Sequence, residues 1–338
     1  MKFSFDALDG LYGADRPRAQ LGTDGQADAQ AVLNRLNARL ASDEEQLALP
    51  EQAEVIISQK SLSRRMAITS AREYREASDP FGKARVYAYA APGCSRWLEA
   101  TPTQTLDQLL TSCEVVTSIS LQLGVDVYGC EGLSKFCGMV MDRKGLHALA
   151  CTAGGDCIFR DNQIRDIIHS FCMRGQLNPE LQKAGLLQDE SVMVNLRRPA
   201  DVLIDRTGSA ASGEREWDRI ALDVKVINAL GSSHFDASIS DGLAAAESYR
   251  QEQIDHLNTG ALCAAQNVSY QPLVFTCQGG CERHAEAILS RIASAVAECE
   301  SVSTMEIKAD LMQEISLSLV RSASKAVERR RPRHQAAA

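Results

Sequence analysis

The feature that most constrains this chain is a stretch of alternating residues between positions 220 and 228. Apolar side chains occupy every second position from Ile220 to Val226, which is the period of a half-buried β-strand. Side chains two residues apart in a strand point to the same face, so Asp223 and Lys225 should lie side by side. The sequence therefore predicts a strand that carries one carboxylate and one ammonium group on the same face.

A second apolar run, Val202 to Ile204, begins directly after Asp201. If it pairs with the first strand as a hairpin across Thr207 to Glu216, Asp201 comes beside Asp223. Two carboxylates can hold Mg²⁺ or Mn²⁺ through hard oxygen ligands, and Lys225 can orient or deprotonate a water molecule beside them. We therefore expect a catalytic site at Asp201, Asp223 and Lys225, with the two aspartates as magnesium ligands. Its chemistry would be hydrolysis of a phosphodiester.

The elements that follow residue 156 predict a mixed α/β fold. Apolar residues recur at helical spacing after Gly154-Gly155-Asp156, so a helix comes first. Pro272 places the last strand at an edge of the sheet or marks its start. This order predicts helices packed on a small central sheet. The expected elements are a first helix with the apolar stripe Ile164, Ile167, Ile168, Phe171 and Cys172, strands at 202–204, 220–227 and 270–275, and helices at 241–257, 282–299 and 305–327.

Composition and charge limit the classes of protein to which the chain can belong. The hydrophobic share of 45% is ordinary for a globular protein. We find no run of about eighteen apolar residues and no basic-then-apolar amino terminus, so we expect neither a membrane partner nor a secretory signal. The protein should be soluble and intracellular or nuclear. A net charge of −8 opposes general binding to nucleic acid unless local basic patches override it.

A cluster of cysteine and histidine residues precedes the predicted α/β region. Cys130, Cys137, His147 and Cys151 offer four ligands within a short stretch, as a tetrahedral structural Zn²⁺ site requires. Cys157 could replace one of them. The alternative is a set of buried thiols, because cysteine is common in protein cores.

Several other residues have two possible roles. Cys277 and Cys281 lack a second pair of ligands nearby and are expected to be core thiols. Arg160 and Arg165 lie off the apolar stripe of their helix and face either a site or water. Together with Arg198 we take them as candidate substrate contacts. The basic run from 328 to 334 is either an exposed tail, a nuclear address or a contact to phosphate.

The chain resembles a known family of nucleases. Pro199-Ala-Asp201 followed by Asp223-Val-Lys225 resembles the PD-(D/E)xK, or restriction-endonuclease-like, nucleases. From about Gly93 to Cys299 the chain is similar to the endonuclease region at the carboxyl end of non-long-terminal-repeat retrotransposon polyproteins. The similar segments are Cys137-Gly138, Asp142, Gly145, 147–151, 153–156, 160–166, 197–202, 221–224, 272–274 and Gly279-Gly280.

This resemblance implies a restriction-endonuclease-like mixed sheet flanked by helices, after a Cys/His zinc knuckle. It implies nicking of DNA, with DNA and element RNA as partners. No Tyr-x-Asp-Asp reverse transcriptase signature is present, so the chain resembles a detached carboxyl-terminal fragment. The implied regions are a mainly helical amino-terminal part with a loose leader at 1–92, a helical linker and zinc knuckle at 93–152, an endonuclease-like domain at 153–300, and a helix with a basic tail at 301–338.

The chain also departs from the family pattern. Asp161 stands where the family tends to have a histidine, and Gln251 and Gln253 stand where related nucleases often carry a lysine. These departures favour a second hypothesis, a catalytically inactive zinc-containing module that binds nucleic acid or protein. A third interpretation is an α/β protein in which the acidic pair is an ordinary surface feature. It would hold if the carboxylates of Asp201 and Asp223 lay more than about 8 Å apart, too far to share one metal ion.

Overall fold

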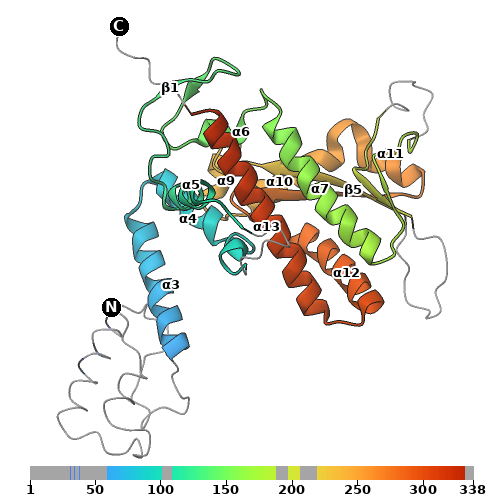
Figure 1. The fold of residues 1–338 in the computed structure, drawn as a ribbon, viewed down its shortest axis with the longest axis horizontal. Coiled ribbons are helices and arrows are strands. Elements are labelled where there is room, and N and C mark those ends of the chain that lie inside the picture. The colour runs from blue at the N-terminus through green and yellow to red at the C-terminus, as the bar shows by residue number, and fades with distance from the viewer. Residues whose placement is uncertain are drawn as a thin grey trace, which may run out of the picture. The chain divides into compact units, whose positions relative to one another are not determined.

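The computed structural model describes residues 59–100, 109–187, 197–205 and 219–331, with positions 31, 34 and 38 (Figure 1). The chain divides into two compact units, Met1–Ser78 and Asp79–Ala338. In the first unit, helix α3 (Gln59–Ala77) is described. The second unit begins before the boundary expected at residue 92. It contains the segment with Cys130, Cys137, His147 and Cys151 (the Cys/His region), the α/β region and the carboxyl-terminal helix in one body.

A four-stranded mixed sheet forms the centre of the second unit, as the sequence predicts for an α/β protein. The order is β3-β4-β5-β6, in which β3 and β4 pair antiparallel, β4 and β5 pair antiparallel, and β5 and β6 pair parallel. The strands are β3 (Pro179–Leu181), β4 (Val202–Ile204), β5 (Ile220–Ile227) and β6 (Ser269–Thr276). Strand β3 is not predicted by the sequence, because three residues that include a proline and a glutamate carry no alternation.

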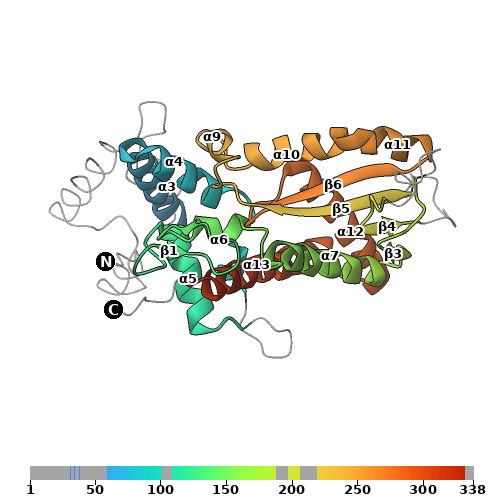
Figure 2. The same cartoon turned by 90° about the horizontal axis from the view of Figure 1, so that it is seen from above.

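Helices cover both faces of this sheet (Figure 2). Helices α10 and α11 lie on one face, and α7, α12 and α13 lie on the other. None of the helices in the described part of the chain has the length and hydrophobicity needed to cross a membrane. The helices that cover the sheet are α7 (Asp156–Arg174), α10 (Ala244–Asp255), α11 (Thr259–Ala265), α12 (Arg283–Glu300) and α13 (Thr304–Arg329). The other elements of the second unit are α4 (Pro80–Ala90), η2 (Arg96–Leu98), α5 (Ser112–Leu123), β1 (Gly132–Leu133), β2 (Val140–Met141), α6 (Leu146–Ala150), α9 (Phe235–Ser238) and η3 (His256–Asn258).

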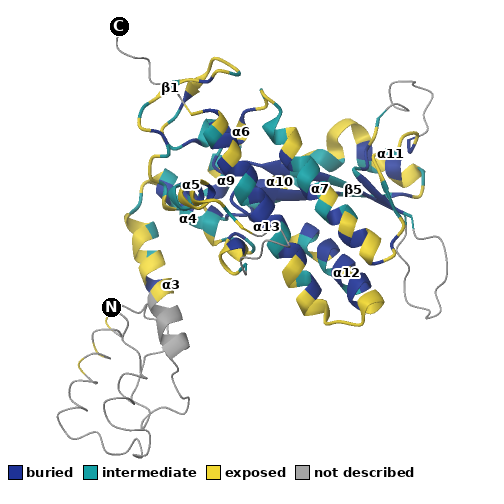
Figure 3. Cartoon of the chain, viewed as in Figure 1, coloured by how far each residue is buried: buried dark blue, intermediate teal, exposed yellow. Residues whose placement is uncertain are grey.

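The alternation of β5 divides its side chains between the two faces as predicted. Its even-numbered residues are buried in the main core with α7, α12 and α13 (Figure 3). Ala221 and Ile227 belong to smaller clusters that contain residues of α11 and α10. Asp223 and Lys225 are odd-numbered like Ala221 and Ile227. Their side chains therefore lie on the same face of β5, the face covered by α10 and α11. Pro272 lies in β6, at the edge of the described sheet, where a missing N–H costs no strand pairing.

The basic run at the end of the chain begins inside the fold and not in an exposed tail. Arg330 follows α13, and its side chain is 0% exposed. Its guanidinium pairs with the Asp156 carboxylate at the start of α7 and donates to the carbonyls of Cys151 and Ala153. It also stacks over the Phe136 ring at 5.0 Å. These contacts fasten the end of α13 to the Cys/His region.

The arginines on either side of Arg330 also form ion pairs. Arg329 pairs with Asp156, and Arg331 pairs with Glu328 at 2.6 Å. The structure therefore corrects the interpretation of the first arginines of this run as a tail, because their partners lie within the same unit. Residues 332–338 lie outside the described residues.

We predict that Arg330→Met lowers the free energy of unfolding by about 3 kcal/mol, because it removes the buried one of the two arginines that pair with Asp156. Urea unfolding followed by circular dichroism measures this change. Arg331→Met is the control, since exposed ion pairs contribute roughly 0–1 kcal/mol. Equal effects of the two substitutions would show that Arg330 has no special structural role.

Candidate functional site

The candidate site lies where β5 extends past the end of β4. Strand β4 pairs with β5 only as far as Leu222, so the next N–H groups on that edge of β5 need other acceptors. Asp201 Oδ2 accepts from Val224 N at 2.9 Å, and Asp161 Oδ1 accepts from Val226 N at 3.2 Å. Two carboxylates thus continue the hydrogen-bond ladder that the short strand leaves incomplete.

The structure brings together the three residues that the sequence predicts as catalytic. The β4–β5 register pairs Val202 with Leu222, which places Asp201 opposite Asp223. Lys225 Nζ lies 3.0 Å from Asp223 Oδ1. Tyr270, on the neighbouring strand β6, donates its hydroxyl to Asp223 Oδ2 at 2.7 Å. Both oxygens of Asp223 therefore have partners, and its side chain is only 13% exposed.

The charges of this group raise the pKa values of two of its members. Burial, followed by the negative charge of Asp223, raises the pKa of Asp201 despite the hydrogen bond from Val224 N–H. Burial of Lys225 favours its neutral form. The surrounding carboxylates of Asp223, Asp201 and Asp161 outweigh this effect and raise the pKa of Lys225. Lys225 is therefore a cation in this arrangement, and the acidic pair is short of positive charge.

Asp161 is a member of the site that sequence reasoning missed. Burial raises its pKa to about 6, although Arg160 and Lys225 oppose this shift. The only signal in the sequence was its place beside Arg160, where the resembled family tends to have a histidine. In the sequence, that departure favours an inactive module and does not indicate a third carboxylate. Its approach to β5 depends on how α7 packs on the sheet, and no local pattern reports this packing.

Arg160 is not available as a substrate contact, contrary to the expectation from sequence. Its side chain points into the core, and the residue is 4% exposed. It donates to Leu149 O at 3.1 Å, Cys277 Sγ at 2.8 Å and Val226 O at 2.9 Å. The contact with Cys277 agrees with the prediction that Cys277 is a buried thiol. Cys281 is buried as well.

The other two predicted substrate contacts have different surroundings. Arg165 is 13% exposed and binds Asp166 Oδ1 at 2.6 Å and Asn162 Oδ1 at 2.8 Å, so its guanidinium is held by its own helix. Arg198 is exposed, three residues before Asp201. Of the three arginines, Arg198 is the one that the structure leaves exposed.

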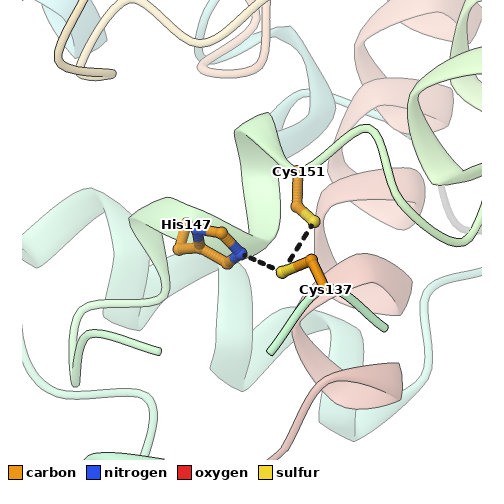
Figure 4. Close-up of side chains that lie close together, drawn as sticks. All are labelled: Cys137, His147 and Cys151. Atoms are coloured by element: carbon orange, nitrogen blue, oxygen red, sulfur yellow. Dashed lines mark hydrogen bonds between the residues drawn. The ribbon is translucent and has the colours of Figure 1, made fainter. Parts of the chain in front are cut away.

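Three of the four predicted soft ligands converge beside α6 (Figure 4). Cys137 Sγ lies 3.1 Å from His147 Nε2 and 3.6 Å from Cys151 Sγ. The potential ligand atoms of these residues all lie within 4.8 Å of one another, so the group could hold a metal ion. Hereafter Cys137, His147 and Cys151 are called the Cys/His group.

Cys130 does not belong to this group. It precedes β1, whereas Cys137 lies in the turn between β1 and β2 and so reaches α6. Cys157 is also outside the group, and its thiol donates to Cys151 O at 3.4 Å. The structure thus corrects the predicted ligand set. The six residues between Cys130 and Cys137 include strand β1, which separates Cys130 from the other three ligands.

Ser134 lies close enough to Cys137 to act on its pKa, whereas Cys130 does not belong to the group. Hydrogen bonds from the Ser134 side chain, then from the Met139 backbone, and also from His147 and Cys151, lower the pKa of Cys137 to about 6. Ser134 precedes Cys137 by the C-x₂-C spacing that is typical of zinc ligands. A search for cysteines alone overlooks it, because a hydroxyl stands where a thiol is usual.

The acidic residues form a looser group than the Cys/His group. Among the described residues, the Cys/His group is the one set of three such ligands that closes within 4.8 Å. The acidic site instead offers two closely spaced carboxylates, Asp201 and Asp223, with Asp161 farther out. Their oxygens are hard ligands of the type that Mg²⁺ and Mn²⁺ prefer.

Comparison with known proteins adds no family assignment: no protein-family model matches the chain, and no curated protein sequence shows significant similarity to it.

We predict that Asp161 makes stability fall as pH rises when no divalent cation is present. Its folded pKa is about 6, above the value of 3.8 for a free carboxyl group, so the unfolded chain loses this proton first and folding is disfavoured once pH passes through this range. Between about pH 4 and pH 7 the wild type should lose roughly 2 kcal/mol more stability than Asp161→Asn, which keeps an acceptor for Val226 N–H. Urea unfolding at both pH values measures the difference. Parallel pH profiles would contradict the assignment.

Proposed function

We propose that the protein is a Mg²⁺-dependent or Mn²⁺-dependent endonuclease that nicks DNA, of the PD-(D/E)xK type found in retrotransposon polyproteins. The observation that carries this proposal is the β4–β5 register, which places Asp201 opposite Asp223, with Lys225 Nζ 3.0 Å from Asp223 Oδ1. The third interpretation, an ordinary surface pair, is disfavoured because the strand register sets the two residues opposite each other and the charge of Asp223 helps to raise the pKa of Asp201.

The roles of the residues follow from their charges and contacts. A divalent cation bound by Asp201 and Asp223 supplies a Lewis acid for the scissile phosphate and lowers the pKa of a bound water. Tyr270 fixes the orientation of the Asp223 carboxylate through its hydroxyl. Lys225 is held in its charged form by the carboxylates, so its first role is to attract and orient a phosphate oxygen. Partial neutralisation of those carboxylates would lower its pKa and bring it closer to a role as a base.

Charge balance also supports a bound cation. Asp161, Asp201 and Asp223 face the ammonium group of Lys225, and the Arg160 guanidinium also acts on Asp161, but burial still disfavours the charged forms of Asp161 and Asp201. Buried carboxylates without enough positive charge keep protons that a cation can replace. This arrangement therefore favours uptake of a divalent cation near neutral pH.

A second candidate function is binding without cleavage by a catalytically inactive relative. The burial of Arg160 favours it, since one expected contact to phosphate is used inside the core. The net charge of −8 points in the same direction. In this case nucleic acid or protein would bind independently of Asp201 and Asp223.

The nuclease proposal predicts the loss of metal-dependent nicking of supercoiled plasmid in Asp201→Asn, Asp223→Asn and Lys225→Met. Each substitution should lower the rate at least about a thousandfold, because the three residues act as a unit. Asp166→Asn, on the exposed side of α7, is the matched control and should keep the activity. Nicking that survives Asp223→Asn would exclude the assignment. Binding of DNA without nicking in the wild type would favour the second candidate.

We propose a structural Zn²⁺ ion for the Cys/His group. The observed distance between Cys137 Sγ and Cys151 Sγ is 3.6 Å. Two thiolates at tetrahedral angles around one zinc ion lie roughly 3.8 Å apart. With Cys130 outside the group, the protein supplies three strong ligands, and Ser134 is a neighbour of Cys137.

This arrangement predicts about one zinc ion per chain by elemental analysis, lost in Cys137→Ser, His147→Ala and Cys151→Ser. Cys130→Ser should retain the metal, because its sulfur is outside the group. Ser134→Cys should complete the ligand set and raise the zinc affinity at least about tenfold, measured by competition with a chromogenic chelator. Purified protein without zinc would favour the alternative of free thiols.

A further inference from the structure

Helix α6 links the Cys/His group to the strand that carries the acidic site. The helix contains His147 and is followed directly by Cys151. Two of its backbone carbonyls point to side chains at or near the end of β5. Leu149 O accepts from Arg160 at 3.1 Å, and Leu146 O accepts from Asn228 Nδ2 at 3.2 Å. The same short helix thus holds metal ligands on one side and contacts the α/β core on the other.

Arg160 continues this connection to one peptide group of β5. Its second terminal nitrogen donates to Val226 O at 2.9 Å, and the next residue, Asp161, accepts from Val226 N at 3.2 Å. Consecutive residues of α7 therefore hold both polar atoms of Val226. Lys225 precedes this residue directly, and the N–H of Val224 binds Asp201.

The burial of Arg160 makes this connection hard to replace. The residue is 4% exposed, and its Nε already lacks a hydrogen-bond partner. If α6 moved away, the nitrogen that binds Leu149 O would lose an acceptor where water does not reach it easily. An unsatisfied buried donor, and a charged one in particular, is strongly unfavourable. The guanidinium would then shift or draw water into the edge of the sheet.

Helix α6 needs support from outside itself. It has five residues, far fewer than an isolated helix requires. Asp142 accepts from the N–H groups of Leu146 and His147 at 2.9 and 2.7 Å and so caps its first turn. The Cys/His group connects both the first turn and the end of the helix to the β1–β2 turn. A metal ion held there would fix the helix in place.

We propose that Arg160 is a positioning residue through which metal binding at the Cys/His group orders the edge of β5 that carries the acidic site. This inference rests on the proposed Zn²⁺ ion and not on DNA cleavage. It assigns the Cys/His group a role within the fold, namely support of Val226 and of the Asp161 and Asp201 carboxylates that bind the same edge.

Hydrogen exchange of the full-length protein tests this connection without an activity assay. Removal of zinc by a chelator should raise amide exchange at Val224 and Val226 at least about tenfold in the wild type. Arg160→Met should show the raised exchange with zinc still bound, and the chelator should add little. Arg174→Met is the matched control on the same helix, because Arg174 binds Glu300 at the surface. If Arg160→Met does not fold, Arg160→Lys, which keeps the positive charge, replaces it in the same exchange measurement.

A second readout is Mn²⁺ binding by calorimetry. Arg160→Met should weaken Mn²⁺ affinity at the acidic site about tenfold, as loss of a residue that supports ligands does. Zinc release with unchanged exchange at Val226 would overturn this proposal alone. Absence of bound zinc in the wild type would overturn it together with the zinc proposal. Loss of nicking in Asp223→Asn bears only on the nuclease proposal.

Discussion

The structure around the site depends on the difference in length between β4 and β5. Strand β5 continues beyond the last residue with which β4 can pair, and two N–H groups on that edge must find acceptors inside the fold. Asp201 and Asp161 supply these acceptors. The two carboxylates therefore have a structural role, because they complete the hydrogen bonding of the sheet edge, in addition to any chemical role. The positions of these acids are fixed by the backbone, so their spacing would be set before the proposed metal ion or a substrate binds.

The same arrangement explains why the site favours positive charge. Carboxylates that accept from strand N–H groups lie close to the sheet and lose water, which raises the pKa values of Asp161 and Asp201. Lys225 compensates one negative charge of the carboxylates, which in turn keep it protonated. A divalent cation would compensate the negative charge that remains. The structural use of the acids and their proposed catalytic use are thus consistent, because the burial that fixes them also creates the need for a cation.

The sequence predicts those parts of this site that depend on short-range patterns. The alternation from Ile220 to Val226 places Asp223 and Lys225 on one face, and a hairpin register places Asp201 opposite Asp223. Asp161 is missed because its position depends on the packing of α7 against β5. The predicted role of Arg160 as a substrate contact is wrong for the same reason, since a residue off the apolar stripe is expected to face a site or water and Arg160 is buried. Strand β3 lacks any periodic signal and forms only because β4 offers it an edge.

Runs of charge illustrate a further limit of sequence reasoning. A series of arginines after a helix indicates an exposed tail when composition alone is considered. Arg330 is nevertheless buried, because Asp156, two backbone carbonyls and the Phe136 ring meet at its guanidinium. Arg160 and Arg330 thus hold the Cys/His region from two sides, one at β5 and one at α13. In both residues the planar guanidinium has several N–H donors, and it joins separate segments by hydrogen bonds to backbone carbonyls that have no strand partner. Burial of an arginine in this chain therefore indicates where separate segments meet, and the residues at such junctions are the ones that local sequence patterns place wrongly.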